Sequence, residues 1–328
     1  MKTSLAVGVI LLFACAPGVN SAQRPAAAET AGSYPAKPIR LVIPQAPGGS
    51  NDIMARYVGG QLAERVGRQV VVDNRPGAEG MIATEIVARA ASDGYTLLMA
   101  SAAFAMNPAV VRKLPYDPIK DFEWAAFLGR SPVVIAVGPS LPVNSLKELL
   151  VLGQSKPNYI TIASAGGFMH FVSAMFRSHA KMDATIALYK GGAPALIDVM
   201  GGHAHMAVPT VVTVIPHLRA GKLRVLATGG TKRISALPDV PTAEEAGLPG
   251  YDASIWWAWA TPAHVPAAIL DKLNTEVAAI LKLPETARRF AVEGAEVEMH
   301  TPAEIREMIK AELVKWARVA QDAGMPKR

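Results

Sequence analysis

The sequence has little cysteine, little charge and no long apolar run beyond its first residues. A single cysteine among 328 residues excludes a disulfide scaffold and any site built from several thiolates. Charged residues make up 18% of the chain, the net charge is +6 and no run of Lys and Arg exceeds two, so nucleic acid is not an expected partner. After the N-terminal segment, no stretch reaches the length of roughly 20 apolar residues that a membrane-spanning helix needs.

The sequence also lacks the common motifs that hold nucleotides, activate a serine or bind a catalytic zinc. It contains no G-x-G-x-x-G, G-x-x-x-x-G-K-[ST], G-x-S-x-G or H-E-x-x-H. His203 and His205 form an H-x-H pattern that could place two metal ligands on one strand face, but no third histidine lies near them. We therefore expect no metal and no cofactor, and take these histidines as exposed residues of a glycine-rich turn.

The first 22 residues have the order of a secretory signal peptide. A positive start precedes ten apolar residues at positions 5–14, and small residues follow. Ten apolar residues cannot cross about 30 Å of hydrocarbon. Removal of residues 1–22 would leave an Ala/Pro-rich flexible leader over 23–33 and a soluble chain in the periplasm. Lipid attachment at Cys15, or burial of the apolar run as a strand, are the alternatives.

The rest of the chain alternates short β-rich runs with amphipathic helical patterns. In a first block we expect strands at 39–44, 70–72 and 95–99, with helices at 51–66 and 82–90 between them. Strand–helix–strand units of this length predict a parallel sheet with right-handed crossovers.

A second block repeats this alternation, and the chain then returns to the first block. The expected strands lie at 133–137, 159–163, 185–189, 206–209 and 224–228, and the expected helices at 145–152, 169–179, 193–200 and 211–220. The segment IWWAWA at 255–260 is predicted to be a strand of the first block, on which helices at 266–282 and 302–322 pack. The predicted fold is α/β with two lobes, each a mostly parallel sheet flanked by helices.

Three strand-to-helix turns carry paired glycines, namely PGGSND at 47–52, SAGG at 164–167 and KGGAP at 190–194. Each is expected at the carboxyl edge of a sheet, where open α/β sheets bind ligands. Unpaired N–H groups at a helix start attract an anion, and glycine lets that anion approach the backbone closely. A tight turn without a ligand is the alternative for any one of them, but three together predict an anion-binding cleft between two lobes.

Two further features have more than one interpretation. Asp52 at a helix start and His170 after the second glycine pair could act as acid and base in a secreted hydrolase or isomerase, although a carboxylate in a first helical turn more often favours the helix dipole.

Trp256, Trp257 and Trp259 alternate, so the last two share one face of a strand. Core packing is the simpler interpretation, and a tryptophan lining the cleft is the alternative.

Six segments carry a resemblance to a known family. In order they are YPAKPIRLVIPQAPGGSNDIMAR, VVVDNRPGAEGMIATEIVARAASDGYTLL, YKGGAPALIDVMGGHAHM, IPHLRAGKLRVLAT, RISALPDVPTAEEAGLPGYDAS and W-x-x-x-A-T-P-A. The chain resembles the Bug-type receptors, the extracytoplasmic solute receptors of tripartite tricarboxylate transporters. This implies a type II periplasmic-binding-protein fold without catalytic activity, a small organic acid as ligand and membrane permease subunits as partners. We expect a monomer with lobe one at 34–132 and 256–328 and lobe two at 133–255.

The resemblance also implies a set of ligand-binding residues. In lobe one they are Pro44, Gln45, Pro47, Gly48, Gly49, Asn51, Ser101 and Asn107. In lobe two they are Ser164, Gly166, His170, Lys190, Gly191 and Gly192. Gln45 stands where the family usually has an aromatic residue, which predicts a more polar pocket lid. The turn from Ser164 to His170 is two residues shorter than usual and lacks a second serine. A ligand sensor subunit with the same fold is the alternative to a transport receptor.

Overall fold

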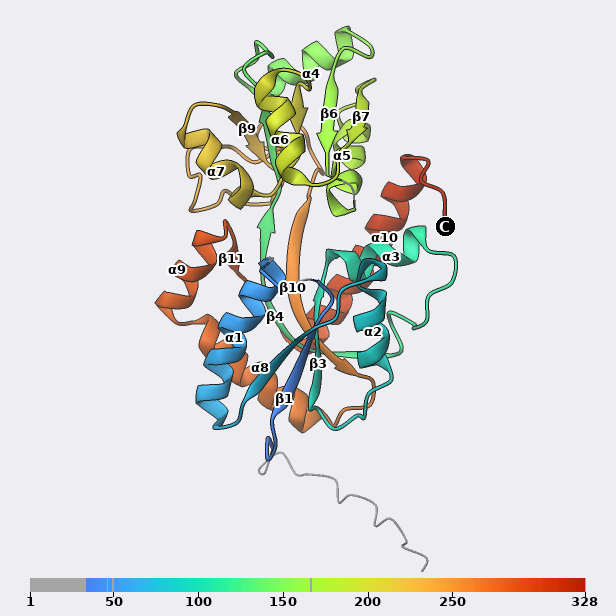
Figure 1. Ribbon diagram of the computed structural model, residues 1–328, viewed down its shortest axis with the longest axis vertical. Coiled ribbons are helices and arrows are strands. Elements are labelled where there is room, and N and C mark those ends of the chain that lie inside the picture. Colours follow the sequence, from blue (N-terminus) through green and yellow to red (C-terminus); the bar gives the residue numbers. More distant parts are fainter. Residues whose placement is uncertain (1–33, 46, 49, 166, 328) are drawn as a thin grey trace, which may run out of the picture.

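The structure is a computed structural model that describes residues 34–45, 47–48, 50–165 and 167–327. Two β-sheets with flanking helices follow one another along the long axis of the molecule (Figure 1). The predicted two-lobed α/β fold is therefore confirmed. The predicted signal peptide and leader, and the candidate residues Gly49 and Gly166, lie outside the described residues. Of the helices within those ranges, none has both the length and the apolar character needed to cross a bilayer.

The first sheet has six strands in the order β11-β4-β10-β3-β1-β2. Its parallel part consists of β1 (Ile39–Ile43), β2 (Val70–Asn74) and β3 (Thr96–Ser101), connected by α1 (Ser50–Val66) and α2 (Met81–Ala88). β1 is the middle strand of the three and almost wholly buried, which explains why four of its five residues are apolar, with Arg40 the one partly exposed position. The predicted strand–helix–strand alternation is confirmed for this part of the chain.

The other half of the first sheet comes from distant parts of the sequence. β10 (Ser254–Pro262) lies between β3 and β4 (Phe122–Pro132) and pairs antiparallel with both. β11 (Glu296–Val297) pairs with the outer side of β4. The IWWAWA segment thus returns to the first sheet as predicted, whereas β4 is a strand that the sequence patterns did not indicate.

The second sheet has five strands in the order β7-β6-β8-β5-β9. These are β5 (Val134–Val137), β6 (Thr161–Ser164), β7 (Thr185–Leu188), β8 (Met206–Ala207) and β9 (Arg224–Thr228). β6 pairs parallel with β7 and β8, but β5 pairs antiparallel with β8 and β9. Both sheets are therefore mixed rather than mostly parallel, because strands on the path between the lobes run against the strands of the βα units.

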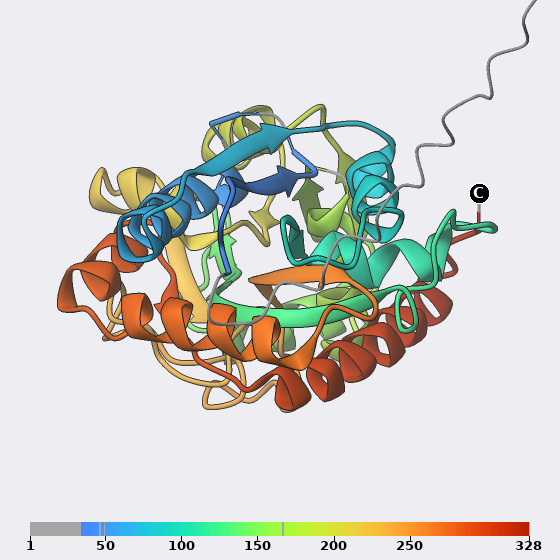
Figure 2. The same cartoon turned by 90° about the horizontal axis from the view of Figure 1, so that it is seen from below.

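Helices flank both sheets. α3 (Ala102–Val110) follows β3 directly, and the second sheet carries α4 (Leu146–Ser155), α5 (Phe168–His179), α6 (Gly192–Gly201) and α7 (Val211–Arg219). The chain ends with α8 (Ala267–Leu281), α9 (Pro284–Val292) and α10 (Pro302–Asp322). α8 and α10 both pack on β4, and Figure 2 shows them running along it. α10 begins with a capping box, in which the side chains of Thr301 and Glu304 each accept a backbone N–H.

The chain passes between the two sheets at two neighbouring places, before and after the second sheet. The amide of Val133 donates to the carbonyl of Ala253 (3.0 Å), and the amide of Ala253 donates to the carbonyl of Gly229 (2.7 Å). The amide of Gly229 donates in turn to the carbonyl of Val133 (2.7 Å). These three hydrogen bonds join the two segments that connect the lobes, and neither sheet shares a strand with the other. We therefore propose these segments as the hinge, with lobe boundaries at 132/133 and 255/256.

The three tryptophans of β10 are core residues. Trp257 and Trp259 are fully buried and share one apolar cluster with Leu41, whereas Trp256 belongs to the cluster on the opposite face, which contains Phe127. The predicted alternation and the core-packing interpretation are both confirmed.

Candidate functional site

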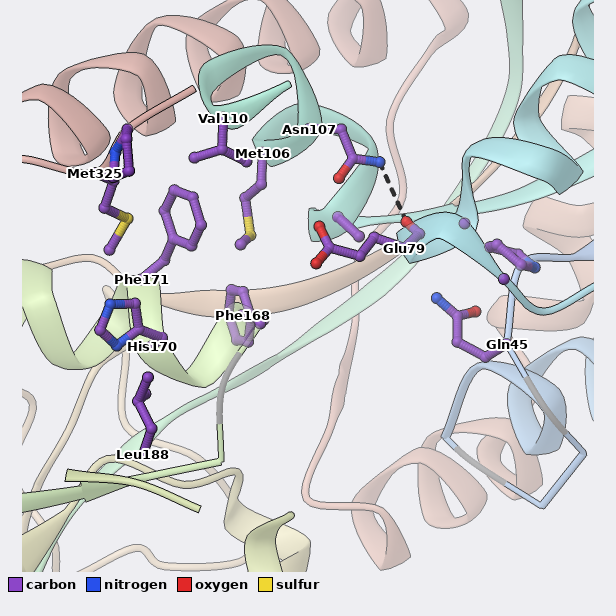
Figure 3. A pocket seen from close by; sticks show the side chains of 16 residues that line it. Gln45, Glu79, Met106, Asn107, Val110, Phe168, His170, Phe171, Leu188 and Met325 are labelled. Carbon is purple, nitrogen blue, oxygen red and sulfur yellow. Dashed lines mark hydrogen bonds between the residues drawn. The ribbon is translucent and has the colours of Figure 1, made fainter. Parts of the chain in front are cut away.

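A cavity of about 490 Å³ lies between the lobes, where α3 faces α5 (Figure 3). Lobe one contributes Pro44, Gln45, Gly77, Glu79, Gly80, Ala103, Met106, Asn107, Val110, Met325 and Pro326. Lobe two contributes Gly167, Phe168, His170, Phe171 and Leu188. Since both lobes form its walls, any rotation about the hinge changes the size of this cavity.

The loop after β1 presents Pro44 and Gln45 to the cavity. The side-chain oxygen of Gln45 accepts a hydrogen bond from Asn51 Nδ2 (2.5 Å), and Figure 3 shows the amide nitrogen of Gln45 on the cavity side. Asn51 Nδ2 also donates to Ser101 Oγ (3.3 Å), and Asn51 Oδ1 accepts from Trp257 Nε1 (2.6 Å). Asn51 and Ser101 are therefore buried supports of this loop and do not line the cavity.

Asp52 holds the same loop from behind. Its carboxylate accepts hydrogen bonds from the amide of Gly48 (3.0 Å), from Arg56 Nε (3.0 Å) and from Asn74 Nδ2 (3.0 Å). Burial would raise the pKa of Asp52, but these bonds and the Arg56 charge outweigh it, so the pKa lies below its ordinary value. Pro47 and Gly48 belong to this loop without being among the residues that line the cavity.

A second loop of lobe one, between β2 and α2, reaches the cavity through an unusual backbone. Gly77, Ala78, Glu79 and Gly80 all have positive φ angles, of 128°, 46°, 55° and 88°. Asn107 Nδ2 donates to the carbonyl of Glu79 (3.2 Å), as the dashed line in Figure 3 shows, and Gly80 N donates to the carbonyl of Gly77 (2.9 Å). The backbone of this loop is therefore held in a conformation that L residues rarely adopt.

Helix α3 supplies a mostly apolar wall. Ala103, Met106, Asn107 and Val110 line the cavity at a spacing that places them on one helical face. The side chain of Asn107 is almost fully buried and bonded to the second loop. Asn107 therefore lines the cavity and also holds the second loop in place.

In lobe two the start of α5 faces the cavity. Gly167 is the N-cap residue of α5, and Phe168, His170 and Phe171 follow it into the cavity wall. Burial, aided by the charge of Arg177, lowers the pKa of His170 below its ordinary value, so the ring is neutral at pH 7. Its Nδ1 is buried and has no hydrogen-bond partner among the described residues. A neutral imidazole with one unused nitrogen can bond a polar ligand atom.

The remaining candidates of lobe two lie apart from this cavity. Ser164 is buried at the end of β6. Gly191 is the N-cap residue of α6, and Gly192 lines a separate cavity of about 150 Å³, next to Thr210 and Thr213. Lys190 is not among the lining residues of the interlobe cavity either. Among the described residues of the three glycine turns, only Gly167 of the second reaches the interlobe cavity, and Ala165 of the same turn lines the smaller cavity together with Gly192 of the third. β7 reaches the interlobe cavity through Leu188, which is 65% exposed.

The histidine pair does not form a metal site. His205 Nδ1 accepts a hydrogen bond from the amide of Thr161 (3.1 Å), and its ring packs on Tyr159 with centroids 5.0 Å apart. Within the ranges that the structure describes, no three or more His, Cys, Asp and Glu residues gather as metal ligands would.

The predicted site residues include four of the sixteen that line the cavity, namely Pro44, Gln45, Asn107 and His170, and miss the rest. The loop of Gly77, Glu79 and Gly80 is not among the predicted glycine turns, although PGAEG also stands between a strand and a helix, as those three turns do. The apolar wall of Met106, Phe171 and Met325 gave no signal, because apolar residues on a helix are as typical of a core as of a binding cavity.

Comparisons with known proteins show the family and the fold of the chain. The model of the family described as tripartite tricarboxylate transporter family receptor (TctC) matches residues 54–325. Protein BugT of Bordetella pertussis is 33% identical over 328 residues, which cover 99% of both chains. The solved structure of R. palustris Rpa4515 with adipate is 32% identical with a TM-score of 0.76, covering 90% of this chain and 100% of that chain. MatC from Rhodopseudomonas palustris with bound malate is 30% identical with a TM-score of 0.70, covering 87% and 99%.

Proposed function

The chain belongs to the tripartite tricarboxylate transporter receptor family, and we propose that it captures a small carboxylate in the interlobe cavity and delivers it to a membrane permease. Receptors of this family are solute-binding proteins, not enzymes. The alternative of a hydrolase using Asp52 and His170 is therefore set aside. The bonds of the Asp52 carboxylate to Gly48, Arg56 and Asn74 agree with this, because they hold a loop.

The observation that carries the proposal is the cavity itself, in which donor groups from both lobes meet. The amide nitrogen of Gln45 faces it from lobe one, and from lobe two the ring of His170, whose Nδ1 has no hydrogen-bond partner among the described residues, lines its wall. Both can donate a hydrogen bond to a carboxylate. The bound adipate of Rpa4515 and the bound malate of MatC support a ligand of this size and class.

The strength of such a site depends on closure. Hydrogen bonds to a charged partner contribute about 1.5–3 kcal/mol each, so four contribute roughly 6–12 kcal/mol. Association costs on the order of 4–15 kcal/mol, and a micromolar Kd needs about 8 kcal/mol net. Turn amides alone are therefore marginal. The apolar wall of Met106, Phe168 and Leu188 supplies the remainder when the lobes close and water leaves.

Delivery to a permease implies a location outside the cytoplasm. The N-terminal segment has the pattern of a secretory signal peptide, and the family is one of transporter receptors. Both support the periplasm as the site of function. A receptor that encounters a membrane partner only in its ligand-bound form needs two conformations, and the hinge at Val133, Gly229 and Ala253 supplies the means.

A thermal-shift panel tests the proposal. The protein is unfolded in denaturant, dialysed to remove copurified molecules and refolded, and its Tm is then measured with mono- and dicarboxylates of two to eight carbons. We expect at least one acid to raise Tm in proportion to the logarithm of its concentration. The primary amides of the same acids serve as matched uncharged controls and should produce no shift. Refolded protein that no carboxylate stabilises would contradict the proposal.

A further inference from the structure

One charged side chain lines the cavity, and its sign is unexpected for a carboxylate receptor. Among the described lining residues only Glu79 carries a formal charge, since His170 is neutral. Figure 3 shows the carboxylate of Glu79 directed into the cavity, towards Met106 and Phe168. A ligand carboxylate placed at that point would be repelled, because two like charges a few ångströms apart in a cavity interact unfavourably.

The backbone fixes the point at which the side chain of Glu79, which is exposed and also interacts within the protein, leaves the loop. Glu79 has a φ of 55°, in the left-handed region, and Ala78 before it has a φ of 46°. The carbonyl of Glu79 accepts from Asn107, and Thr84 Oγ1 donates to the carbonyl of Gly80 (2.9 Å). Because neighbours on α2 and α3 hold the loop, the side chain leaves it in a defined direction. Residues in such backbone conformations often have a functional reason to be there.

The surroundings of Glu79 differ on its two sides. Towards Pro44 and Gln45 the cavity wall is polar and offers the Gln45 amide nitrogen. Towards α3 and α5 the wall is apolar, with Met106, Phe168, Phe171 and Leu188 among its residues. An acceptor carboxylate thus lies between a donor region and an apolar region.

We propose that the ligand is a zwitterion with an apolar body, of the class of the apolar α-amino acids, whose ammonium group is bonded by Glu79. This deepens the proposed function and rests on it. The ligand carboxylate lies towards Gln45, the ammonium group lies at Glu79, and the side chain lies along Met106 and Phe171. An ionised carboxyl group has two oxygens with about four acceptor sites, so Glu79 can accept from a ligand in addition to bonds within the protein.

Four compounds that share a 2-phenylethyl unit test this proposal. L-Phenylalanine carries both charges, 3-phenylpropanoate lacks the ammonium group, benzylmalonate has a carboxylate in its place, and 2-phenylethylamine lacks the carboxylate. Affinities are measured by titration calorimetry on refolded protein, with the corresponding leucine series as a second skeleton. We expect phenylalanine or leucine to bind at least tenfold more tightly than its deaminated analogue, and the malonate analogue to bind most weakly.

The variant Glu79→Gln separates charge from shape. It should remove the advantage of the amino acid over the deaminated acid and bring the malonate analogue to within about threefold of that acid. Glu64→Gln, on the exposed face of α1, is the matched control and should leave all affinities unchanged. Circular dichroism and Tm establish that the variants are folded. Because glutamine has the same size, a loss confined to amino-acid binding would report charge rather than misfolding.

The outcomes are distinguishable. If the malonate analogue or the deaminated acid binds as tightly as the amino acid or more tightly, and Glu79→Gln does not change these affinities, this inference is overturned. The proposal of a carboxylate receptor then still stands. Binding of 2-phenylethylamine without any acid overturns the proposed function while retaining a role for Glu79 in binding a cation. Absence of binding by all four compounds and the leucine series, with another carboxylate of the panel binding, overturns the inference alone. Absence of binding by every acid overturns both.

Discussion

Asn51 at the start of α1 connects three parts of lobe one through a single side chain. It accepts from Trp257 in β10 and donates to Gln45 and Ser101. Because the oxygen of Gln45 is held in this way, its nitrogen is left facing the cavity. Asn51 thus positions a group that faces the cavity, whereas the family resemblance implied that it lines the cavity itself.

Gly80 shows how backbone conformation shapes the cavity. Its φ is 88°, and a Cβ atom added there would lie 2.9 Å from Pro44 Cβ. Gly80→Ala should lower the free energy of unfolding by about 1–2 kcal/mol and weaken carboxylate binding, because the strained loop must displace Pro44. Gly60→Ala is the control: it lies within α1 with open space around it and should stabilise by about 0.5–1 kcal/mol. Urea unfolding measures both, and a stabilising Gly80→Ala would contradict the expectation.

His170 predicts a specific pH dependence of stability. Its pKa is lowered in the folded protein by burial and by Arg177, from an ordinary value near 6.5. Below that pH the unfolded chain binds a proton that the folded protein resists, so the free energy of unfolding should fall as pH decreases from about 6.5. His170→Gln should make that decline shallower between about pH 6.5 and 5. Parallel declines of wild type and variant, measured by urea unfolding at several pH values, would show that the ring contributes nothing.

At the scale of elements, α10 connects the lobes from outside the sheets. It follows lobe one in the sequence and packs on β4 and α3, yet it also contacts α5 of lobe two. The fully buried Trp316 of α10 meets Phe168 and Phe171 edge-on, with ring centroids 5.7 and 6.0 Å apart. Since both phenylalanines line the cavity, α10 supports the apolar wall from behind.

Trp316→Ala therefore should affect stability and binding together. Loss of a buried tryptophan costs about 3–5 kcal/mol, and the released Phe168 and Phe171 would weaken ligand binding as well. Val314→Ala on the same helix, where the side chain is 72% exposed, should change the free energy of unfolding by less than about 0.5 kcal/mol. If Trp316→Ala destabilises the fold but preserves affinity, α10 does not support the cavity.

At the scale of the whole molecule, the two lobes also touch at a second place. The amide and hydroxyl of Ser235, in the segment after β9, both donate to Glu296 of β11, at 2.9 and 2.8 Å. In Figure 1 β11 and α7 lie on one side of the long strands β4 and β10, and α3 and α5 lie on the other. Rotation about the hinge that closes the cavity therefore separates Ser235 from Glu296.

Removing this contact should favour the closed form. Ser235→Ala deletes one hydrogen bond, worth about 1 kcal/mol, and should tighten binding of the most stabilising acid of the panel by up to about fivefold. Ser92→Ala is the matched control, because Ser92 Oγ donates to the carbonyl of Ala263 within lobe one and its loss should leave affinity unchanged. Weaker binding by Ser235→Ala would mean that the contact persists when ligand is bound.

Much of the fold could be predicted because its elements follow local rules. Apolar runs bounded by glycine turns gave the strands β1 to β3 and β5 to β9, and the alternation in IWWAWA placed Trp256 opposite Trp257 and Trp259. β4 was not predicted as a strand, because Gly129 and Arg130 interrupt its apolar pattern and because its burial comes from contacts with β10 and α8. α3 was not predicted as a helix, because it contains Pro108 and proline normally argues against a helix interior.

The candidate site could be predicted only in part. Local sequence shows which turns precede a helix, and this drew attention to His170, whereas Gln45 and Asn107 came from the family resemblance; the structure brings all three together around one cavity. It cannot show which turns face each other across a hinge, and so Gly192 was grouped with a cavity that it does not line. Whether the predicted residues bind ligand stays a prediction, which the variants at Glu79 and Gly80 address.

The place of β10 inside the first sheet also bears on how the polypeptide acquires its structure. Every strand of the second sheet lies between residues 134 and 228, whereas the first sheet has no bridge between β3 and β4 until residue 262 has been made. A growing chain can therefore complete the sheet of lobe two before that of lobe one. Lobe one must wait, with the strands of its first fragment still unpaired on one side, and during this interval they are open to binding by a chaperone.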